Sequence, residues 1–235
     1  MWQKWHFLKR SQTCVICGGF PTAPNILICS VCEHKSKDWF SQAGDRKATP
    51  FERHTFQTQF DFVEFEFGFL WAPRQARAKV RLLHALKGRS CRATWRLLAD
   101  RFIHSQRHPC IKGRPIFLPV PGREQHGDDH AWRWAQALKE MLGGHVLRVF
   151  CHPKSSRQQQ KSRGKRERRQ VQLELLRPDL AAWLQYKHKQ GWRLVVVDDV
   201  VTTGATARAA WQALGRPQAL SIWALAHRIT LRNST

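Results

Sequence analysis

The clearest pattern in the chain is the alternation of short apolar runs with longer segments in which apolar residues recur every three or four positions. The runs that predict strands are residues 116–118, 146–150, 194–197 and 222–225. The segments that predict helices are residues 131–142, followed by Gly143 and Gly144 as a stop, and residues 207–214. Short strands that alternate with amphipathic helices are typical of a parallel sheet covered on both faces. The pattern therefore predicts an α/β domain, with the uninterrupted run 194–197 at the centre of its sheet.

Upstream of this alternation, phenylalanines occupy nearly every second position between residues 60 and 69. A period of two indicates a half-buried strand, and the slip at Val63 indicates a bulge in it. A base-stacking platform is the alternative interpretation of the same phenylalanines. Farther along, helical spacing predicts two helices on either side of the break at Lys87, Gly88 and Arg89.

The length of 235 residues allows one main domain and a small accessory module, because domains typically have about 100–200 residues. The 42% of hydrophobic residues, with 11 Trp and 13 Phe, is typical of a packed globular protein. Residues 1–35 have little amphipathic pattern, so this module needs a covalent or metal staple. We expect residues 36–58, which are polar and rich in turn formers, to be a linker, and residues 59–235 to form the main domain.

The chain is strongly basic, with 40 Lys and Arg against 17 Asp and Glu and a formal net charge of +23. An excess of this size attracts polyanions, and nucleic acid is the first expectation, although a generally basic surface is the alternative. No segment approaches the roughly 18–20 apolar residues of a membrane span, and the amino terminus lacks the apolar segment of a signal peptide. We therefore expect a cytoplasmic protein without a membrane span.

Four of the seven cysteines form two close pairs, Cys14-x2-Cys17 and Cys29-x2-Cys32. Two such pairs supply four thiolates that can close a tetrahedron around Zn2+, and a closed four-cysteine site is structural. The alternative, a redox CxxC pair, normally occurs once and at a helix start within a larger fold. The spacing favours a structural zinc knuckle. The cysteines expected to be plain thiols are Cys91, Cys110 and Cys151.

The strongest chemical pattern is the segment 194–206, in which an apolar strand stops at two acids and a turn of small residues opens a helix. Phosphate binds where several backbone N–H groups converge at a helix N-terminus, and Gly and Thr let the backbone approach while hydroxyls donate. Two carboxylates would repel that phosphate, but they suit the hydroxyls of an attached ribose or a bound Mg2+. The pattern thus indicates a ribose 5-phosphate site. Its residues are Asp198, Asp199, Thr202, Thr203, Gly204, Ala205 and Thr206.

The alternative for this segment is an ordinary turn in which Thr202 or Thr203 caps the helix and the acids are solvated. Capping explains the threonines and the glycine. It leaves Asp198 and Asp199 at the end of a buried strand without a reason.

A third pattern is the basic stretch 154–169, which has eight Lys or Arg residues and one Glu. Such a run can neutralise several phosphates of a nucleic acid, and a solvated loop is the alternative. The residues predicted to bind nucleic acid are Arg157, Arg163, Lys165, Arg166, Arg168 and Arg169.

The segment 194–206 closely resembles the phosphoribosyl pyrophosphate loop of type I phosphoribosyltransferases: four apolar residues, two acids, two apolar residues and Thr-Thr-Gly-x-Thr. The resemblance implies a type I phosphoribosyltransferase-like parallel sheet flanked by helices. It also implies that Asp198 and Asp199 contact the ribose hydroxyls, that residues 202–206 hold the 5′-phosphate, and that Mg2+ accompanies phosphoribosyl pyrophosphate. The pyrophosphate of such ligands binds a second loop, for which residues 120–123 are the match.

The whole chain resembles the ComF family. The shared features, in order, are the two CxxC pairs, Leu-x-x-Leu-Lys-Gly at 83–88, Leu-Pro-Val-Pro at 118–121, the basic stretch and the ribose-phosphate loop. The resemblance implies a role in DNA uptake during natural transformation. It further implies binding of phosphoribosyl pyrophosphate or a nucleotide and of single-stranded DNA, with DNA-uptake or recombination proteins as partners. Where relatives have Arg-Gly-Phe-Asn-Gln, this chain has His-Gly-Asp-Asp-His at 126–130, so the family's substrate contacts at this place are not carried over to these residues.

Two other functions fit the same loop. One is a catalytically active phosphoribosyltransferase of nucleotide salvage or modification. In its reaction, Mg-bound pyrophosphate would leave the anomeric carbon of the substrate through an oxocarbenium-like state stabilised by position and charge. A nucleotide-sensing regulator would keep the loop for binding alone. Pyrophosphate release with a free base would identify the enzyme, and nucleotide-dependent protein partnering would identify the regulator.

Overall fold

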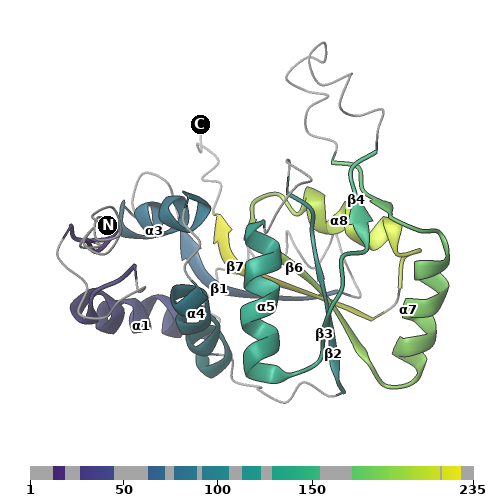
Figure 1. The fold of residues 1–235 in the computed structure, drawn as a ribbon, viewed down its shortest axis with the longest axis horizontal. Helices are drawn as coiled ribbons and strands as arrows, with labels where there is room; N and C mark the ends of the chain where they lie inside the picture. The colour runs from purple at the N-terminus through teal and green to yellow at the C-terminus, as the bar shows by residue number, and fades with distance from the viewer. Residues whose placement is uncertain are drawn as a thin grey trace, which may run out of the picture.

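The computed structural model describes residues 13–18, 27–44, 63–71, 77–88, 92–105, 113–122, 129–153, 171–217 and 219–228. Helices and strands alternate along much of this chain (Figure 1). The helices are α1 (Ser30–Gly44), α3 (Arg77–Gly88), α4 (Arg92–Ser105), α5 (His130–Leu142), α7 (Asp179–Lys189) and α8 (Ala205–Ala213). The strands are β1 (Val63–Trp71), β2 (Pro115–Pro119), β3 (His145–Val146), β4 (Phe150–Cys151), β5 (Glu174–Leu175), β6 (Arg193–Val201) and β7 (Leu220–Arg228). Within these ranges, no helix is both long enough and apolar enough to cross a membrane.

Five strands form one sheet in the order β1-β7-β6-β2-β3, and each is parallel to its neighbours. Strand β6 is the central strand, as the apolar run 194–197 predicts, and its residues Val195, Val196 and Val197 are fully buried. Strand β1 pairs with β7 in one continuous register from Val63, the first residue of the strand that the structure describes, to Trp71. Residues 60–62, which begin the predicted strand and lie on one side of the predicted bulge, are outside the described chain.

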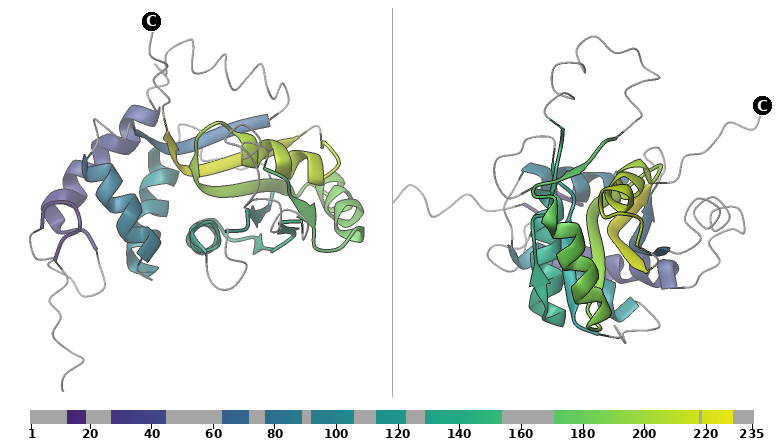
Figure 2. Two further views of the ribbon diagram at one scale, coloured as in Figure 1. Left: turned by 90° about the horizontal axis from the view of Figure 1, so that it is seen from above. Right: turned by 90° about the vertical axis from the view of Figure 1, so that its right-hand side faces the viewer.

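The helices cover both faces of this sheet. Side chains alternate between faces along a strand, so Val195 and Val197 pack in one hydrophobic cluster with Trp134 of α5, while Leu194 and Val196 pack in another. The second cluster includes residues of α7 and α8. Figure 2 shows α5 and α8 on opposite sides of the strands. The mixed α/β class, with a mainly parallel sheet flanked by helices, is therefore confirmed.

The strand predicted at residues 146–150 is wrong as a single element. Strand β3 pairs with β2, and the N–H of Leu147 still donates to the carbonyl of Phe117 at 2.9 Å. The chain then leaves the sheet, and β4 pairs antiparallel with β5. The apolar run is shared between two sheets because each part finds a different hydrogen-bonding partner.

Helix α1 extends through residues 36–44 of the segment predicted to be a linker, and residues 45–58 of that segment lie outside the described chain. The rings of Trp39 and Phe40 lie edge-on to Phe69 of β1, with centroids 5.8 and 5.6 Å away. A Cβ atom on Gly68 would lie 2.7 Å from the Phe40 ring, so the glycine makes room for it. The cysteine module and the main domain consequently share one hydrophobic core.

Candidate functional site

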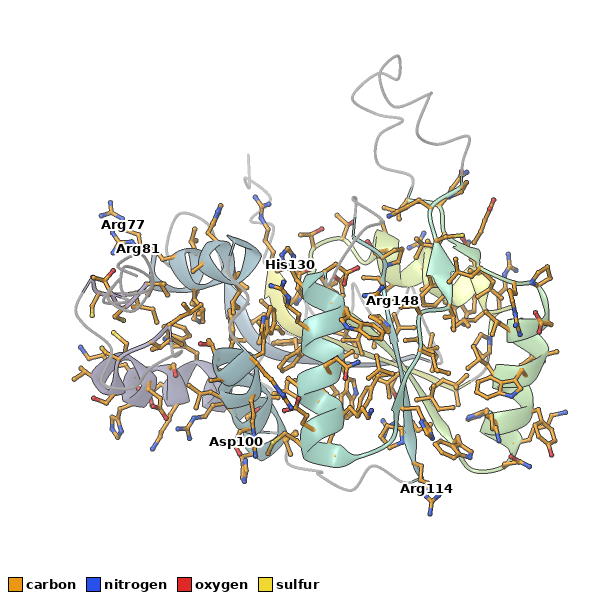
Figure 3. The ribbon with its side chains drawn as sticks, viewed as in Figure 1. Arg77, Arg81, Asp100, Arg114, His130 and Arg148 are labelled. Atoms are coloured by element: carbon orange, nitrogen blue, oxygen red, sulfur yellow. The ribbon has the colours of Figure 1, made fainter. Side chains whose placement is uncertain are left out.

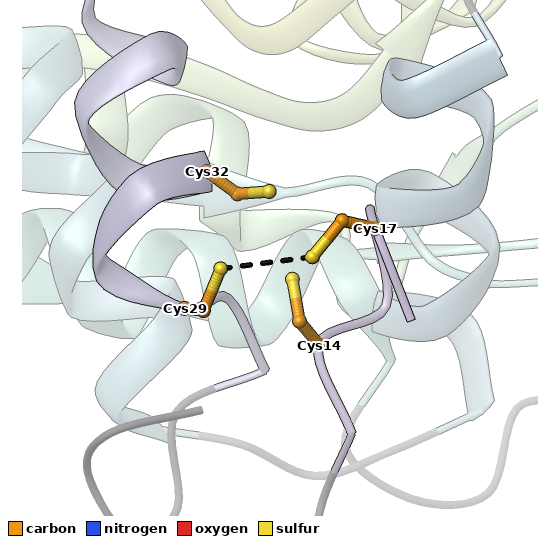
Figure 4. Close-up of side chains that lie close together, drawn as sticks. All are labelled: Cys14, Cys17, Cys29 and Cys32. Atoms are coloured by element: carbon orange, nitrogen blue, oxygen red, sulfur yellow. Dashed lines mark hydrogen bonds between the residues drawn. The ribbon is translucent and has the colours of Figure 1, made fainter. Parts of the chain in front are cut away.

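The four cysteines of the two CxxC pairs lie together next to the start of α1 (Figure 4). Their sulfur atoms are all within 4.8 Å of one another, and those of Cys17 and Cys29 are 3.7 Å apart. Cys14, Cys29 and Cys32 are buried, and Cys17 is exposed. Four convergent thiols at this spacing are close enough to bind a metal ion, which confirms the predicted grouping.

Tight backbone turns bring the two pairs together. The N–H of Gly18 donates to the carbonyl of Cys14 at 2.8 Å, and Gly18 has a φ of +81°, a conformation that glycine adopts without steric cost. The N–H of Val15 donates to the carbonyl of Leu27 at 2.9 Å, which joins the first pair to the segment before the second. The knuckle geometry thus follows from the small residue after Cys17.

The module is anchored on the main domain by two further hydrogen bonds. The buried N–H of Leu27 donates to Oγ1 of Thr94 in α4 at 3.0 Å, and Arg81 of α3 donates to the carbonyl of Ile16 at 3.0 Å. Each CxxC pair is therefore tied to a different helix of the main domain.

The backbone around Cys14 favours its thiolate. Burial alone raises the pKa of this thiol, but hydrogen bonds from the backbone at Cys17, Cys29 and Ile16 outweigh it and lower the pKa from 9.0 to about 6. Burial, together with the neighbouring sulfurs, raises the pKa of Cys32. A metal ion bound by all four sulfurs would remove this difference, because metal-bound thiols are deprotonated.

The second candidate site lies at the carboxyl ends of β2 and β6. These strands are neighbours, yet the chain leaves them in opposite directions: β2 leads through α5 to β3, and β6 leads through α8 to β7. Parallel α/β sheets bind ligands at such a topological switch point. The predicted ribose-phosphate loop and the predicted pyrophosphate loop both follow these two strands, so the fold brings them to the same edge.

The two acids are placed differently from the prediction, because β6 does not stop at them but continues to Val201. In a regular strand Asp198 and Asp199 would point to opposite faces, but at this end of β6 their carboxyl groups interact with each other. The Asp198 side chain is buried, and its Oδ1 accepts the N–H of Asp199 at 2.8 Å. Asp199 Oδ2 lies 3.6 Å from Nδ1 of His130, the first residue of α5. Of the two carboxylates, that of Asp199 faces the helix across the switch point.

Burial, reinforced by the adjacent Asp199 carboxylate, raises the pKa of Asp198 well above its ordinary value. A buried carboxylate in this position is stabilised by hydroxyl donors or by a cation. The acid pair is thus suited to a ligand that supplies either.

The small-residue turn after β6 exposes Thr202 and Thr203. Gly204 is the N-cap of α8, with φ 73° in the left-handed region, and no side chain caps the helix through a hydrogen bond. The alternative in which Thr202 or Thr203 caps α8 is therefore wrong. Because the first amides of a helix have no partner within it, the start of α8, including Ala205 and Thr206, can receive an anion.

The turn after β2 continues the pairing with β6, since the N–H of Val120 donates to the carbonyl of Val197 at 3.0 Å. The next amide is already committed: the N–H of Gly122 donates to Oδ2 of Asp129 at 2.9 Å. Asp129 Oδ1 accepts the N–H of Trp132 at 2.7 Å and so caps α5. Arg123, the last residue of the predicted pyrophosphate loop, lies outside the described chain, as do residues 124–128.

Sequence reasoning did not assign a site role to His130 or Arg148. The Arg148 guanidinium lies 4.2 Å from the ring centroid of Trp132, in the first turn of α5. Figure 3 shows His130 at the upper end of α5 and Arg148 beside that helix. An acid directly before an amphipathic run is a helix start signal, so Asp129 could have been found as a cap; nothing in the sequence indicates the Arg148 contact.

The basic stretch predicted to bind nucleic acid lies outside the described residues, and so do two of the three isolated cysteines. These residues are Arg157, Arg163, Lys165, Arg166, Arg168, Arg169, Cys91 and Cys110. The third cysteine, Cys151, lies in β4, where burial raises the pKa of its thiol.

No protein-family model and no curated protein sequence matches this chain. The resemblances to type I phosphoribosyltransferases and to the ComF family stay predictions.

Proposed function

We propose that this protein binds a ribose 5-phosphate ligand, either phosphoribosyl pyrophosphate or a nucleotide, in a type I phosphoribosyltransferase-like domain. The observation that carries the proposal is the joint position of Asp199 and Gly204 at the switch point of the sheet. The carboxylate of Asp199, which can accept hydrogen bonds from hydroxyl groups, lies five residues before Gly204, where α8 begins and an anion can bind. This is the order of groups in a sugar that carries a terminal phosphate.

Different residues would bind different parts of the ligand. The amides at the start of α8 and the hydroxyls of Thr202, Thr203 and Thr206 would hold the 5′-phosphate. The carboxylates of Asp198 and Asp199 would accept hydrogen bonds from the ribose hydroxyls. Mg2+ would accompany phosphoribosyl pyrophosphate as the counter-ion of its pyrophosphate.

We assign Zn2+ to the four-cysteine cluster. Four thiols within 4.8 Å of one another match the all-cysteine set of structural zinc sites, which leaves no position open for water. The ion would hold the module to α1 and would take no part in ligand chemistry.

The proposed role is that of a ComF-like competence protein, which acts in the cytoplasm on single-stranded DNA during DNA uptake. The net charge of +23 supports a polyanionic partner. Partners among DNA-uptake or recombination proteins belong to the same proposal.

A second candidate, a nucleotide-sensing regulator, is favoured by one observation. The Asp129 carboxylate already accepts the N–H of Gly122. In an active phosphoribosyltransferase this N–H would donate to a pyrophosphate oxygen. A nucleoside monophosphate has no pyrophosphate, so it needs only the acid pair and the start of α8 and would leave this bond intact.

Calorimetric titration of the metal-loaded protein with ribose 5-phosphate and with Mg-phosphoribosyl pyrophosphate tests the proposal. Asp199→Ala is expected to weaken ribose 5-phosphate binding by at least about tenfold, because the loss of hydrogen bonds to a carboxylate costs about 1.5–3 kcal/mol. Asp179→Ala is the matched control, since Asp179 is an exposed acid on α7 paired with Arg177. Both variants should keep the metal content of the parent. Undiminished affinity in Asp199→Ala would remove the site.

A further inference from the structure

Rings and cations gather at the amino ends of β2, β3 and β6, on the edge of the sheet opposite the switch point. We call this the amino-edge surface. Its residues are Arg114, His145, Trp183, Tyr186, Lys187 and Trp192. Figure 3 shows Arg114 at the lower end of the sheet and His130 at the upper end. Because β6 has nine residues that each rise about 3.3 Å, the two edges are about 26 Å apart.

Lys187 lies at the centre of the amino-edge surface. Its Nζ is 5.7 Å from the ring centroid of Trp183, 5.9 Å from that of Tyr186 and 5.9 Å from that of Trp192. One ammonium group thus contacts three rings, two from its own helix and one from the turn after it. Such contacts fix the cation beside the ring faces.

The ring of Trp192 continues the surface across the strands. The Arg114 guanidinium lies 5.9 Å from its centroid, and the His145 ring is 5.2 Å away at an interplanar angle of 32°. Arg114 directly precedes β2, and His145 begins β3. Rings and cations therefore alternate over three neighbouring elements.

Hydrogen bonds fix the backbone that carries these side chains and one of the rings. The N–H of Trp192 donates to the carbonyl of Lys187 at 3.1 Å, and the N–H of Arg193 donates to the carbonyl of Arg114 at 2.9 Å. The hydroxyl of Tyr186 accepts from Nε2 of Gln190 at 2.8 Å. A surface held in this way loses little conformational freedom when a ligand binds.

Two of these rings are open to solvent, since Trp183 is 40% exposed and Tyr186 is 57% exposed. Single exposed apolar residues are common, but here they stand together and beside cations. The segments 113–119, 143–148 and 180–197, which build the surface, contain no acidic residue. The nearest acid along α7, Asp179, is at the far end of that helix and is paired with Arg177. The surface therefore suits a ligand with both flat apolar faces and negative charges.

We propose that the amino-edge surface binds a single-stranded nucleic acid, whose bases stack on Trp183 and Tyr186 while Lys187 and Arg114 contact its phosphates. Stacking on exposed rings is tolerant of sequence, because every base has a flat π face. Duplex nucleic acid keeps its bases inside the helix and cannot use the rings. The proposal deepens the single-stranded partner of the proposed function, but it uses neither the ribose-phosphate loop nor the basic stretch.

The test compares two probes of equal charge: an oligothymidylate of about 20 nucleotides and an abasic deoxyribose-phosphate strand of the same length. Affinity of the full chain for each is measured by fluorescence anisotropy of an end label. The parent should prefer the oligothymidylate. Trp183→Ala/Tyr186→Ala should weaken oligothymidylate binding by about tenfold or more and leave abasic binding unchanged. Trp183→Phe/Tyr186→Phe, which keeps both rings, should retain the preference.

Charge is tested separately. Lys187→Ala should weaken both probes and lower the slope of log affinity against log salt by about 0.7, the value for one contact with a single strand. The matched control is Arg96→Ala, which removes an exposed cation from α4 and should change the slope less.

Unchanged oligothymidylate affinity in the ring-deleted variant, or an equal loss for the abasic strand, would overturn the proposal. Urea unfolding of the same variant checks that it is folded, whether or not the protein binds ribose 5-phosphate. Ribose 5-phosphate titration separates the two proposals, because Asp199→Ala can lose ribose 5-phosphate binding while it keeps base-dependent binding of the oligothymidylate.

Discussion

The carboxylate of Asp129 accepts the backbone N–H of Gly122 at 2.9 Å and joins the turn after β2 to the first turn of α5. The same carboxylate caps α5 through the N–H of Trp132. A negative charge consequently lies at the turn where the proposed ligand would place its pyrophosphate. In the proposed site, this contact would decide between ribose phosphates with and without a pyrophosphate.

Asp129→Asn is expected to raise the affinity for Mg-phosphoribosyl pyrophosphate by about tenfold relative to ribose 5-phosphate. The substitution removes the like charge, which at 4 Å costs about 1 kcal/mol in water and up to about 4 kcal/mol near a protein surface, whereas tenfold corresponds to about 1.4 kcal/mol; Asn still caps a helix well. Calorimetric titration with both ligands gives the ratio. An unchanged ratio would mean that the pyrophosphate does not approach Gly122.

Gly204→Ala is expected to lower the free energy of unfolding by about 1 kcal/mol and to weaken ribose 5-phosphate binding. A side chain is strained at φ 73°, and relief of that strain moves the amides at the start of α8. Gly215→Ala is the control, since Gly215 has a similar φ of 77° but follows α8. Urea unfolding and calorimetry should show equal destabilisation and a binding defect in Gly204→Ala alone. Equal binding by the two variants would contradict a role for the α8 amides.

Cys17→Ser is expected to lower the bound metal below one ion per chain and to reduce stability by several kcal/mol. Structural zinc contributes roughly 10–16 kcal/mol in isolated zinc-finger peptides, and here the packed main domain limits the loss. Metal analysis and thermal unfolding measure the two effects, and chelation of the parent should reproduce the second. Cys151→Ser, at a cysteine outside the cluster, should change neither.

Because His227 is buried, the free energy of unfolding is expected to fall in mild acid. Burial lowers its pKa from 6.5 to about 4, so between these values the unfolded chain binds a proton that the folded chain does not. The free energy of unfolding should therefore fall by about 3 kcal/mol as the pH decreases from 6.5 to 4, and the contribution is constant above and below that window.

Urea unfolding at several pH values, for the parent and for His227→Phe, isolates this effect. The phenylalanine keeps a ring against Phe65 and Phe67, which contact His227 with centroids 5.5 and 5.4 Å away. The difference between the two proteins removes the contributions of all other titrating groups. Parallel pH profiles would show that His227 is not the acid-sensitive residue.

Elements with a strong local pattern could be predicted from the sequence. The run 194–197 predicted the central strand because a strand buried on both faces must be apolar at every position. The stop at Gly143 was visible because a left-handed residue at a helix end favours glycine, and its φ is 73°. The cysteine spacing predicted the cluster because four thiolates in two CxxC pairs are typical ligands of one metal ion.

Features that depend on tertiary contacts could not be predicted in this way. Helix α1 continues past residue 36 because Phe40 finds Phe69, which is distant in sequence. The acids were expected after β6, but pairing with β7 extends that strand to Val201. Helix α7 was missed because Leu184 is its buried residue and much of the rest faces solvent, which leaves little amphipathic pattern.

Because α1 packs on β1, the absence of a metal ion would affect the main domain as well as the cysteine module. Cys29 and Cys32 hold the start of the helix, and Phe40, farther along it, covers Phe69 and Gly68 at the border of the sheet. A newly made chain without its ion would leave this aromatic face uncovered, and exposed apolar patches promote aggregation and proteolysis. The amount of usable protein in a cell would then follow metal availability during synthesis, even though the cysteine cluster is not part of the proposed ligand site.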